Sequence, residues 1–233
     1  MKTVIAIQAR LKSTRLPRKI LAEIGGKPLI SQLFRRMRAV RAADDVVISC
    51  PYADAGEVQE LTMLPCRSGP EEDVLTRLLI AAKGYDFLVR VTADCPAMPP
   101  DLVEHMISDA VNRDEVVQNW RPRAYPDGFD CEVWPVKVLL ELSDSLTGDD
   151  REWFAQAYLD QKKRSFHPGG DKQLAKMRLT VDYPEDLEVI EALYSDMGDE
   201  VWGARRIIEW CYQNPRIMRF NKMHVKDFGA RPV

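Results

Sequence analysis

The residues with the clearest chemical potential form a basic segment directly after a predicted first strand. Residues 7–20 read IQARLKSTRLPRKI, and five of these fourteen side chains are cationic, although the whole chain carries 33 Lys and Arg against 36 Asp and Glu. The five are Arg10, Lys12, Arg15, Arg18 and Lys19. A loop at the carboxyl end of the first strand of an α/β sheet is a usual ligand site. Its cations suit a polyanion such as a nucleoside triphosphate.

The basic segment offers several kinds of phosphate ligand. Ser13, Thr14 and successive backbone N–H groups can donate hydrogen bonds to phosphate oxygens, and Arg10, Arg15 and Lys19 add positive charge. The plainer interpretation is a solvated basic surface, but a place at a strand end favours phosphate binding. The chain contains neither Gly-x-x-x-x-Gly-Lys-Ser/Thr nor Gly-x-Gly-x-x-Gly. P-loop ATPases and dinucleotide-dependent oxidoreductases therefore lose their strongest sequence support.

Two aspartates form a second feature, because each ends a run rich in β-branched residues shortly before a proline. Asp94 follows VRVTA, and Asp182 follows LTV. If both runs are neighbouring parallel strands, the two carboxylates meet at one edge of the sheet and can jointly hold a hard cation. Mg²⁺ typically takes one or two protein carboxylates together with substrate phosphates and water. The alternative is that each aspartate only caps the helix that follows it.

Two further segments carry polar residues in suggestive positions. Residues 125–132 read YPDGFDCE, in which Asp127 and Gly128 predict a tight turn. Asp130 and Glu132 then share one face of the next strand, which contacts either a polar substrate or water. In the second segment, residues 69–77, Arg77 lies one turn after Asp73 on a predicted helix, and a surface ion pair is the simplest interpretation.

The elements that must position these residues alternate along the chain between short β-rich runs and helical stretches. This alternation predicts an α/β fold with a mostly parallel sheet flanked by helices. We expect strands at residues 3–8, 46–49, 87–92, 116–119, 129–134 and 177–181. We expect helices that begin near residues 28, 54, 70, 100, 136, 150, 184 and 204. Asp54 and Glu57 predict a capping box, and the helix that begins at Pro70 should run to residue 83.

Length and composition set the class of protein. The 233 residues fit a single domain, with an inserted lobe at about 120–175 and a tail at about 214–233. An apolar share of 45%, a charged share of 30% and a net charge of −3 are ordinary for a globular protein and argue against binding of nucleic acid. We expect no membrane span, no signal peptide and a cytoplasmic location. The five scattered cysteines predict reduced thiols.

Several of these segments together resemble one family. IQARLKSTRLPRKIL, GGKPLI, EDVLTR, VRVTADCP and LTVDYPEDL are similar to the cytidylyltransferases of the spore-coat polysaccharide biosynthesis type. That group is similar to the enzymes that activate acidic sugars (Kdo, sialic-acid-like nonulosonic acids) as CMP-sugars. The resemblance covers about residues 3–195 and implies a Rossmann-like nucleotidyltransferase fold.

The resemblance also implies roles for individual residues. The segment from Ala9 to Lys19 would wrap the triphosphate of CTP. Asp94 and Asp182 would bind Mg²⁺ and, with Arg10 and Lys19, form the catalytic set. The implied nucleotide contacts are Ala9, Arg10, Ser13, Arg15, Lys19, Arg77 and Arg90. The implied acceptor-sugar pocket contains Tyr125, Asp127, Asp130 and Glu132.

Two departures from the family pattern concern particular positions. Family members often have Gly where this chain has Arg18. Residues 150–153 read DREW, where many members have a Glu-His pair. This difference leaves the identity of the acceptor open.

The tail carries Ile217, Met218, Phe220, Met223 and Phe228. These residues offer enough apolar area for a homodimer contact or for packing on its own domain.

The sequence therefore predicts transfer of CMP from CTP to an acidic sugar, with release of pyrophosphate. Three alternatives stay open. The acceptor could be another small phosphate- or carboxylate-bearing alcohol, or the chain could be a non-catalytic nucleotide-binding subunit. A nucleotide-sugar-dependent glycosyltransferase is the third, but such enzymes commonly hold their metal with Asp-x-Asp, which this chain lacks.

Overall fold

The fold is built around one seven-stranded sheet, seen in a computed structural model that describes residues 1–161, 165–198 and 200–225. The strand order is β5-β4-β1-β6-β8-β7-β9. Neighbouring strands are parallel, except that β8 runs antiparallel to both β6 and β7. The strands of this sheet are β1 (Thr3–Gln8), β4 (Asp45–Pro51), β5 (Cys66–Gly69), β6 (Phe87–Thr92), β7 (Val116–Gln118), β8 (Cys131–Pro135) and β9 (Ser165–Phe166).

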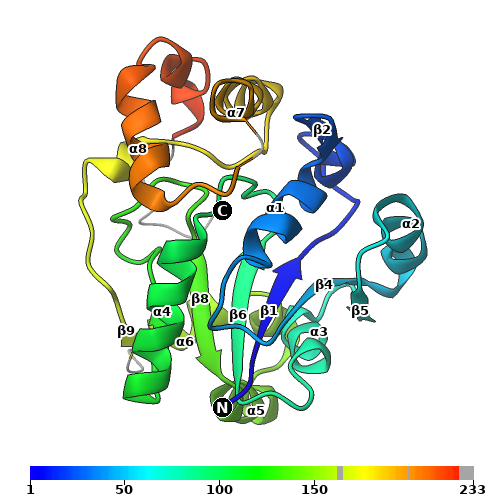
Figure 1. Ribbon diagram of the computed structural model, residues 1–233. Coiled ribbons are helices and arrows are strands. Elements are labelled where there is room, and N and C mark those ends of the chain that lie inside the picture. Colours follow the sequence, from blue (N-terminus) through cyan, green and yellow to red (C-terminus); the bar gives the residue numbers. More distant parts are fainter. Residues whose placement is uncertain (162–164, 199, 226–233) are drawn as a thin grey trace.

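Helices cover both faces of the sheet (Figure 1). The helices α1 and α4 pack on one face, with α7 and α8 in the same core cluster beyond the carboxyl end of β1, and α3, α5 and α6 pack on the other face. The helices are α1 (Leu29–Met37), α2 (Tyr52–Thr62), α3 (Val74–Ala81), α4 (Pro100–Arg113), α5 (Val136–Ser145), α6 (Phe154–Asp160), α7 (Pro184–Met197) and α8 (Ala204–Gln213). The expected class, a mostly parallel α/β sheet flanked by helices, is confirmed.

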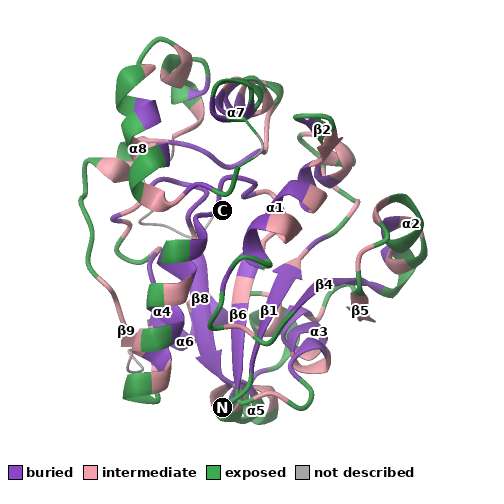
Figure 2. Cartoon of the chain, viewed as in Figure 1, coloured by how far each residue is buried: buried purple, intermediate pink, exposed green. Residues whose placement is uncertain are grey.

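Strand β1 shows how the sequence fills both layers. Val4 and Ala6 face the core under α3 and α5, whereas Ile5 and Ile7 face the core under α1 and α4. This alternation follows from the period of two in a strand, and a strand buried on both faces is apolar throughout. In Figure 2 the central strands are accordingly coloured as buried and the outer sides of the helices as exposed.

Short elements complete the fold at the edges. The two-stranded hairpin of β2 (Glu23–Ile24) and β3 (Lys27–Pro28) turns through Gly25 and Gly26, both at positive φ, as a tight hairpin turn requires. Five 3₁₀ helices serve as connectors in the described residues. They are η1 (Lys19–Leu21), η2 (Gly148–Arg151), η3 (Leu174–Lys176), η4 (Ile217–Arg219) and η5 (Lys222–His224).

Two predicted regions have a specific place in this fold. The stretch predicted as an inserted lobe, about 120–175, contributes β8 to the sheet and α5 and α6 to its second face. In the tail, Ile217 and Met218 pack against the core, whereas Phe220 and Met223 are exposed. Phe228 and the rest of 226–233 lie outside the described residues. No helix in the described ranges is long and apolar enough to cross a membrane.

Candidate active site

A pocket lies at the carboxyl ends of β1 and β6, where Gln8 pairs with Thr92. Its cavity measures about 220 Å³, and the basic segment after β1 forms one wall. The pocket gathers every residue predicted to bind nucleotide or metal. Those from the basic segment are Ala9, Arg10, Ser13, Arg15 and Lys19. Those from elsewhere in the chain are Arg77, Arg90, Asp94 and Asp182.

The basic segment is fixed at both of its ends. Ala9 continues the β1 ladder by donating from its N–H to the Ser49 carbonyl at 2.9 Å. The N–H of Leu11 donates to Oδ2 of Asp54 at 2.8 Å. The predicted capping box of Asp54 is therefore wrong: α2 begins at Tyr52, without a side-chain cap, and Asp54 holds the basic loop instead. Arg18 closes the loop in a left-handed conformation, with φ at 56°, at the position where family members often have Gly.

Asp94 and Asp182 lie on either side of one ammonium group. The Nζ of Lys19 is 2.7 Å from Oδ2 of Asp94 and 2.7 Å from Oδ1 of Asp182. Arg15 makes a third contact, from Nη2 to Oδ1 of Asp182 at 2.8 Å. Burial raises the pKa of Asp182, but Lys19, Arg15 and Arg178 outweigh it and hold that pKa below its usual value. Asp182 is therefore available as an anion at neutral pH.

The backbone contacts that position Asp182 differ from those predicted. Residues 177–181 are not a strand of the sheet in the described structure. Their backbone groups bond to loops: the Leu179 N–H donates to the Asp127 carbonyl at 2.6 Å, and the Val181 N–H donates to the Asp94 carbonyl at 2.8 Å. This second bond, and not a ladder between neighbouring strands, brings Asp182 next to Asp94.

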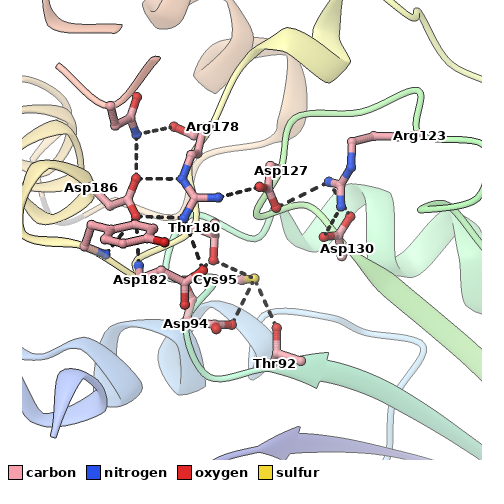
Figure 3. A network of polar contacts seen from close by, with 12 residues as sticks. Thr92, Asp94, Cys95, Arg123, Asp127, Asp130, Arg178, Thr180, Asp182 and Asp186 are labelled. Atoms are coloured by element: carbon pink, nitrogen blue, oxygen red, sulfur yellow. Dashed lines mark hydrogen bonds and ion pairs between the residues drawn. The ribbon is translucent and has the colours of Figure 1, made fainter. Parts of the chain in front are cut away.

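Arg178 is a residue of the site that sequence reasoning missed. Its guanidinium is 3% exposed and donates to Oδ2 of Asp127 at 2.7 Å, to Oδ2 of Asp182 at 3.2 Å and to Oδ1 of Asp186 at 2.7 Å (Figure 3). Asp186 also accepts hydrogen bonds from the backbone N–H groups of Asp182 and Tyr183, which fixes the start of α7. Arg178 thus joins the predicted acceptor loop to the predicted metal ligand.

The four predicted acceptor residues are not among the described residues that line the pocket. Asp127 binds Arg178, and Asp130 makes a bidentate pair with Arg123, with distances of 2.8 and 2.9 Å (Figure 3). Burial raises the pKa of Asp130 to about 6, against the opposing charge of Arg123.

The other two acceptor residues also have protein contacts. Glu132 accepts hydrogen bonds from Arg90 and from the indole of Trp134. Tyr125 is half-buried against the core. The acceptor role of the four residues stays a prediction.

The environment of Arg77 differs from the exposed surface position that the sequence suggested. It is 2% exposed, and its Nη1 donates to the carbonyls of Pro70 and Glu71, at 2.6 and 2.9 Å. The expected surface ion pair with Asp73 is therefore wrong, because Asp73 binds Arg151 and caps α3 through the Thr76 N–H. The helix accordingly begins at Val74 and not at Pro70, since the cap residue must lie outside the helical backbone.

The residues present suit a divalent cation that is completed by substrate. Two carboxylate oxygens converge on one position of positive charge, the Lys19 ammonium, and hard oxygen ligands are those that Mg²⁺ or Mn²⁺ prefers. Among the described residues, no group of three or more His, Cys, Asp or Glu side chains could hold a metal by itself. This donor set fits an ion that takes its remaining ligands from phosphates and water.

The sheet order and the pocket at its carboxyl edge define a nucleotidyltransferase fold, and comparison with known proteins narrows the class. A family model described as cytidylyltransferase matches residues 4–214. The chain therefore belongs to the cytidylyltransferase family. The sequence resemblance, the enzyme class and the expected fold are thereby confirmed.

Individual relatives agree with this assignment. The spore coat polysaccharide biosynthesis protein SpsF of Bacillus subtilis is 27% identical over 90% of this chain and 93% of its own length. A 3-deoxy-manno-octulosonate cytidylyltransferase of Chloroherpeton thalassium is 34% identical, but the match spans only 46% of this chain and 45% of that protein. A solved cytidylyltransferase from Leptospira borgpetersenii has a TM-score of 0.87 at 26% identity and covers 94% of this chain and 97% of its own.

A more distant structure shares the fold. The CMP:2-keto-3-deoxy-manno-octonic acid synthetase, solved in complex with CTP, has a TM-score of 0.67 at 19% identity, over 84% of this chain and 100% of its own.

Proposed function

We propose that this protein transfers CMP from CTP to an acidic, nonulosonic-acid-like sugar and releases pyrophosphate, in the cytoplasm, for surface polysaccharide or glycan biosynthesis. The observation that carries the proposal is the pocket itself, in which a cationic loop faces two carboxylates that converge on one point. The SpsF relative and the synthetase solved with CTP support the choice of nucleotide and pathway class.

The reaction needs an in-line displacement at the α-phosphorus of CTP. An acceptor oxygen forms the new bond to phosphorus, the bond to the bridging oxygen of the β-phosphate breaks, and pyrophosphate leaves with that oxygen. Arg10, Arg15 and Lys19 would bind the departing pyrophosphate, and Ser13 would orient it. The protein's contribution is then mainly positioning and electrostatic stabilisation of charge that develops during the displacement.

A divalent cation, which we propose to be Mg²⁺, would be held by Asp94 and Asp182. When bound, it neutralises charge on the phosphate oxygens that it contacts. Lys19 must then exchange its carboxylate partners for phosphate oxygens, and its pKa favours that role. Burial lowers the pKa of Lys19, but Asp94 and Asp182 raise it above its ordinary value, so the side chain reaches the substrate as a cation.

The acceptor pocket is proposed to contain Tyr125, Asp127, Asp130 and Glu132. Each of the three carboxylates already has an arginine partner, namely Arg178, Arg123 and Arg90. These arginines offset the negative charge that would otherwise repel a carboxylate-bearing acceptor. An acidic sugar is therefore compatible with this side of the site.

The decisive experiment is a screen of acidic sugars against each of the four nucleoside triphosphates with Mg²⁺, scored by release of pyrophosphate. We expect release with CTP and a nonulosonic or related keto-acid sugar. Release only with a phosphate-bearing alcohol would favour the alternative nucleotidyltransferase. Binding of CTP without release for any acceptor would favour a non-catalytic subunit.

A further inference from the structure

The nucleotide pocket presents one large aromatic ring to solvent. Trp153 lines the pocket and is 54% exposed, whereas Trp134 and Trp202 are each 1% exposed. An exposed indole is a large apolar surface with a flat face, and aromatic rings at the mouth of a site commonly stack on planar ligands. Trp153 has no role in the function proposed above.

The backbone on both sides of Trp153 is held firmly. Two residues before it, Arg151 donates to Oδ2 of Asp73 at 2.8 Å, to Oγ1 of Thr76 at 2.9 Å and to the Ser143 carbonyl at 2.8 Å. Directly after it, Phe154 is fully buried, with its ring 5.2 Å from that of Trp134. Because its neighbours are fixed, the backbone at Trp153 is already in place beside the pocket, and stacking of a ligand need not order this part of the chain.

Trp153 enters the pocket from a loop that lies beside α3. The contacts of Arg151 place this loop against the first turn of α3, on the sheet face covered by α3, α5 and α6. Asp182 precedes α7, whose buried residues belong to the other core cluster, the one that contains α1 and α4. A triphosphate held at the aspartates and the basic loop therefore directs the nucleoside toward the α3 end.

Glu152 adds a polar group beside the ring. It lines the same pocket and is half-buried, and no ion pair is found for it in the described structure. Its charge acts on Arg77: burial lowers the pKa of Arg77, the charges of Arg10 and Arg90 lower it further, and Glu152 acts in the opposite direction. Glu152 lines the pocket together with Val74 and Arg77 of α3.

We propose that Trp153 stacks on the cytosine ring of CTP and that Glu152 accepts a hydrogen bond from its exocyclic amino group, so that these two residues select the base. This inference rests on the proposed use of CTP. A carboxylate accepts from the amino group of cytosine, whereas uracil presents a carbonyl oxygen at the same position and is repelled.

The first test is the affinity of the purified full-length protein for CTP with Mg²⁺, measured by calorimetry, together with tryptophan fluorescence. Trp153→Ala should weaken CTP binding about 5- to 150-fold, the range seen when a base-stacking ring is removed. Trp153→Phe should keep most of the affinity and abolish the fluorescence change on binding. Tyr212→Ala, which removes an exposed ring on α8, is the matched control and should bind CTP like the wild type.

The second test is nucleotide choice. Glu152→Gln should lower the ratio of kcat/KM for CTP over UTP about 5- to 100-fold, because an amide can both accept and donate. Unchanged CTP affinity in Trp153→Ala, or a rise in the acceptor KM alone, would overturn the stacking role while leaving the proposed reaction intact. If the wild type binds CTP through Trp153 but releases no pyrophosphate, the inference stands and the proposed reaction fails.

Discussion

Asp94 and Asp182 are held together by the backbone hydrogen bond from Val181 to Asp94 and by cations, and not by the sheet. Two carboxylates this close repel each other unless a positive charge lies between them, and Lys19 supplies it at 2.7 Å from each. Asp182 forms additional ion pairs with Arg15 and with Arg178. We propose that a divalent cation takes the position that the Lys19 ammonium occupies between the pair.

Replacing either aspartate should abolish most of the turnover. We expect Asp94→Asn and Asp182→Asn each to lower kcat for pyrophosphate release about 10²–10³-fold, because the amide cannot neutralise the charge of a bound divalent cation. Circular dichroism should show a native fold in both variants. Glu191→Gln, which changes an exposed acid of α7, is the control. Wild-type turnover in either aspartate variant would remove that residue from the proposed catalytic set.

Asp182 also predicts a particular dependence of stability on pH. Its pKa in the folded state lies below the ordinary value of 3.8, so the unfolded chain binds more protons between the two values. The free energy of unfolding should therefore fall as the pH falls below about 3.8 and stay level above it, as far as this group is concerned. Denaturant titrations from pH 2 to pH 6 should show a shallower acid slope for Asp182→Asn than for the wild type. Parallel slopes would contradict the assignment.

Sequence reasoning named residues that the structure brings together in one pocket, but it did not find the residues that support them. The basic segment and the two aspartates were predicted because each is a local pattern next to an apolar run. Arg178, Arg123 and Arg151 carry no such pattern. Arg178 pairs with Asp127 across 51 positions of the sequence, and Arg151 pairs with Asp73 across 78 positions. Only the folded topology therefore reveals these pairs.

The extended segment at residues 177–181 shows the limit of local patterns for elements. Its β-branched residues predict a strand, and its backbone is extended, but its partners are the loops at Asp127 and Asp94. Strand propensity reports that a residue fits an extended backbone, not which neighbour will pair with it. In contrast, β1 and β6 agree with their predicted bounds, because each consists mainly of buried apolar residues that contribute to both core clusters.

Gly128 allows the backbone of this extended segment to pack closely against the turn that contains Asp127. Its φ is +106°, and a Cβ there would lie 2.5 Å from the carbonyl carbon of Leu179 and 2.6 Å from the nitrogen of Thr180. We expect Gly128→Ala to lower the free energy of unfolding by more than about 2 kcal/mol, because backbone atoms cannot yield as a flexible side chain does. The shift should also move Asp182 and weaken metal-dependent turnover.

The matched control for Gly128 is Gly26, which also has a positive φ, at +73°, but has nothing within 4 Å of the added Cβ. Gly26→Ala should cost about 1 kcal/mol, the ordinary penalty for a left-handed conformation. Denaturant unfolding of both variants separates the two contributions. Equal losses would mean that close contact with Leu179 is unimportant.

The C-terminal segment makes direct contacts with residues beside the site. Asn221 is 1% exposed, and its Nδ2 donates to the Arg178 carbonyl at 3.1 Å and to Oδ1 of Asp186 at 2.9 Å. Three residues later, the His224 ring stacks on Tyr183, with centroids 3.7 Å apart. The tail therefore packs on its own domain in this part, and a homodimer contact stays a prediction for its exposed side.

Removing the Asn221 amide should loosen Arg178 and Asp186 together. We expect Asn221→Ala to lower the free energy of unfolding by about 1–3 kcal/mol, because two buried acceptors lose their donor. In a chain of this size that corresponds to a fall in Tm of roughly 2–12 °C, measurable by calorimetry. Phe220→Ala, which changes an exposed neighbour, should leave Tm nearly unchanged. A normal Tm in Asn221→Ala would mean that the tail only rests on the surface.

The contact between Lys19 and Asp182 spans 163 positions of the chain. During synthesis on the ribosome, the first strands and the basic loop emerge long before their acidic partner is made, and domains begin to fold from the N-terminus. A nascent chain that ends before residue 182 thus holds an unfinished charge cluster. Regaining the ability to bind nucleotide would consequently mark the last stage of folding, and a protein nicked between these two positions should lose that ability once its fragments separate.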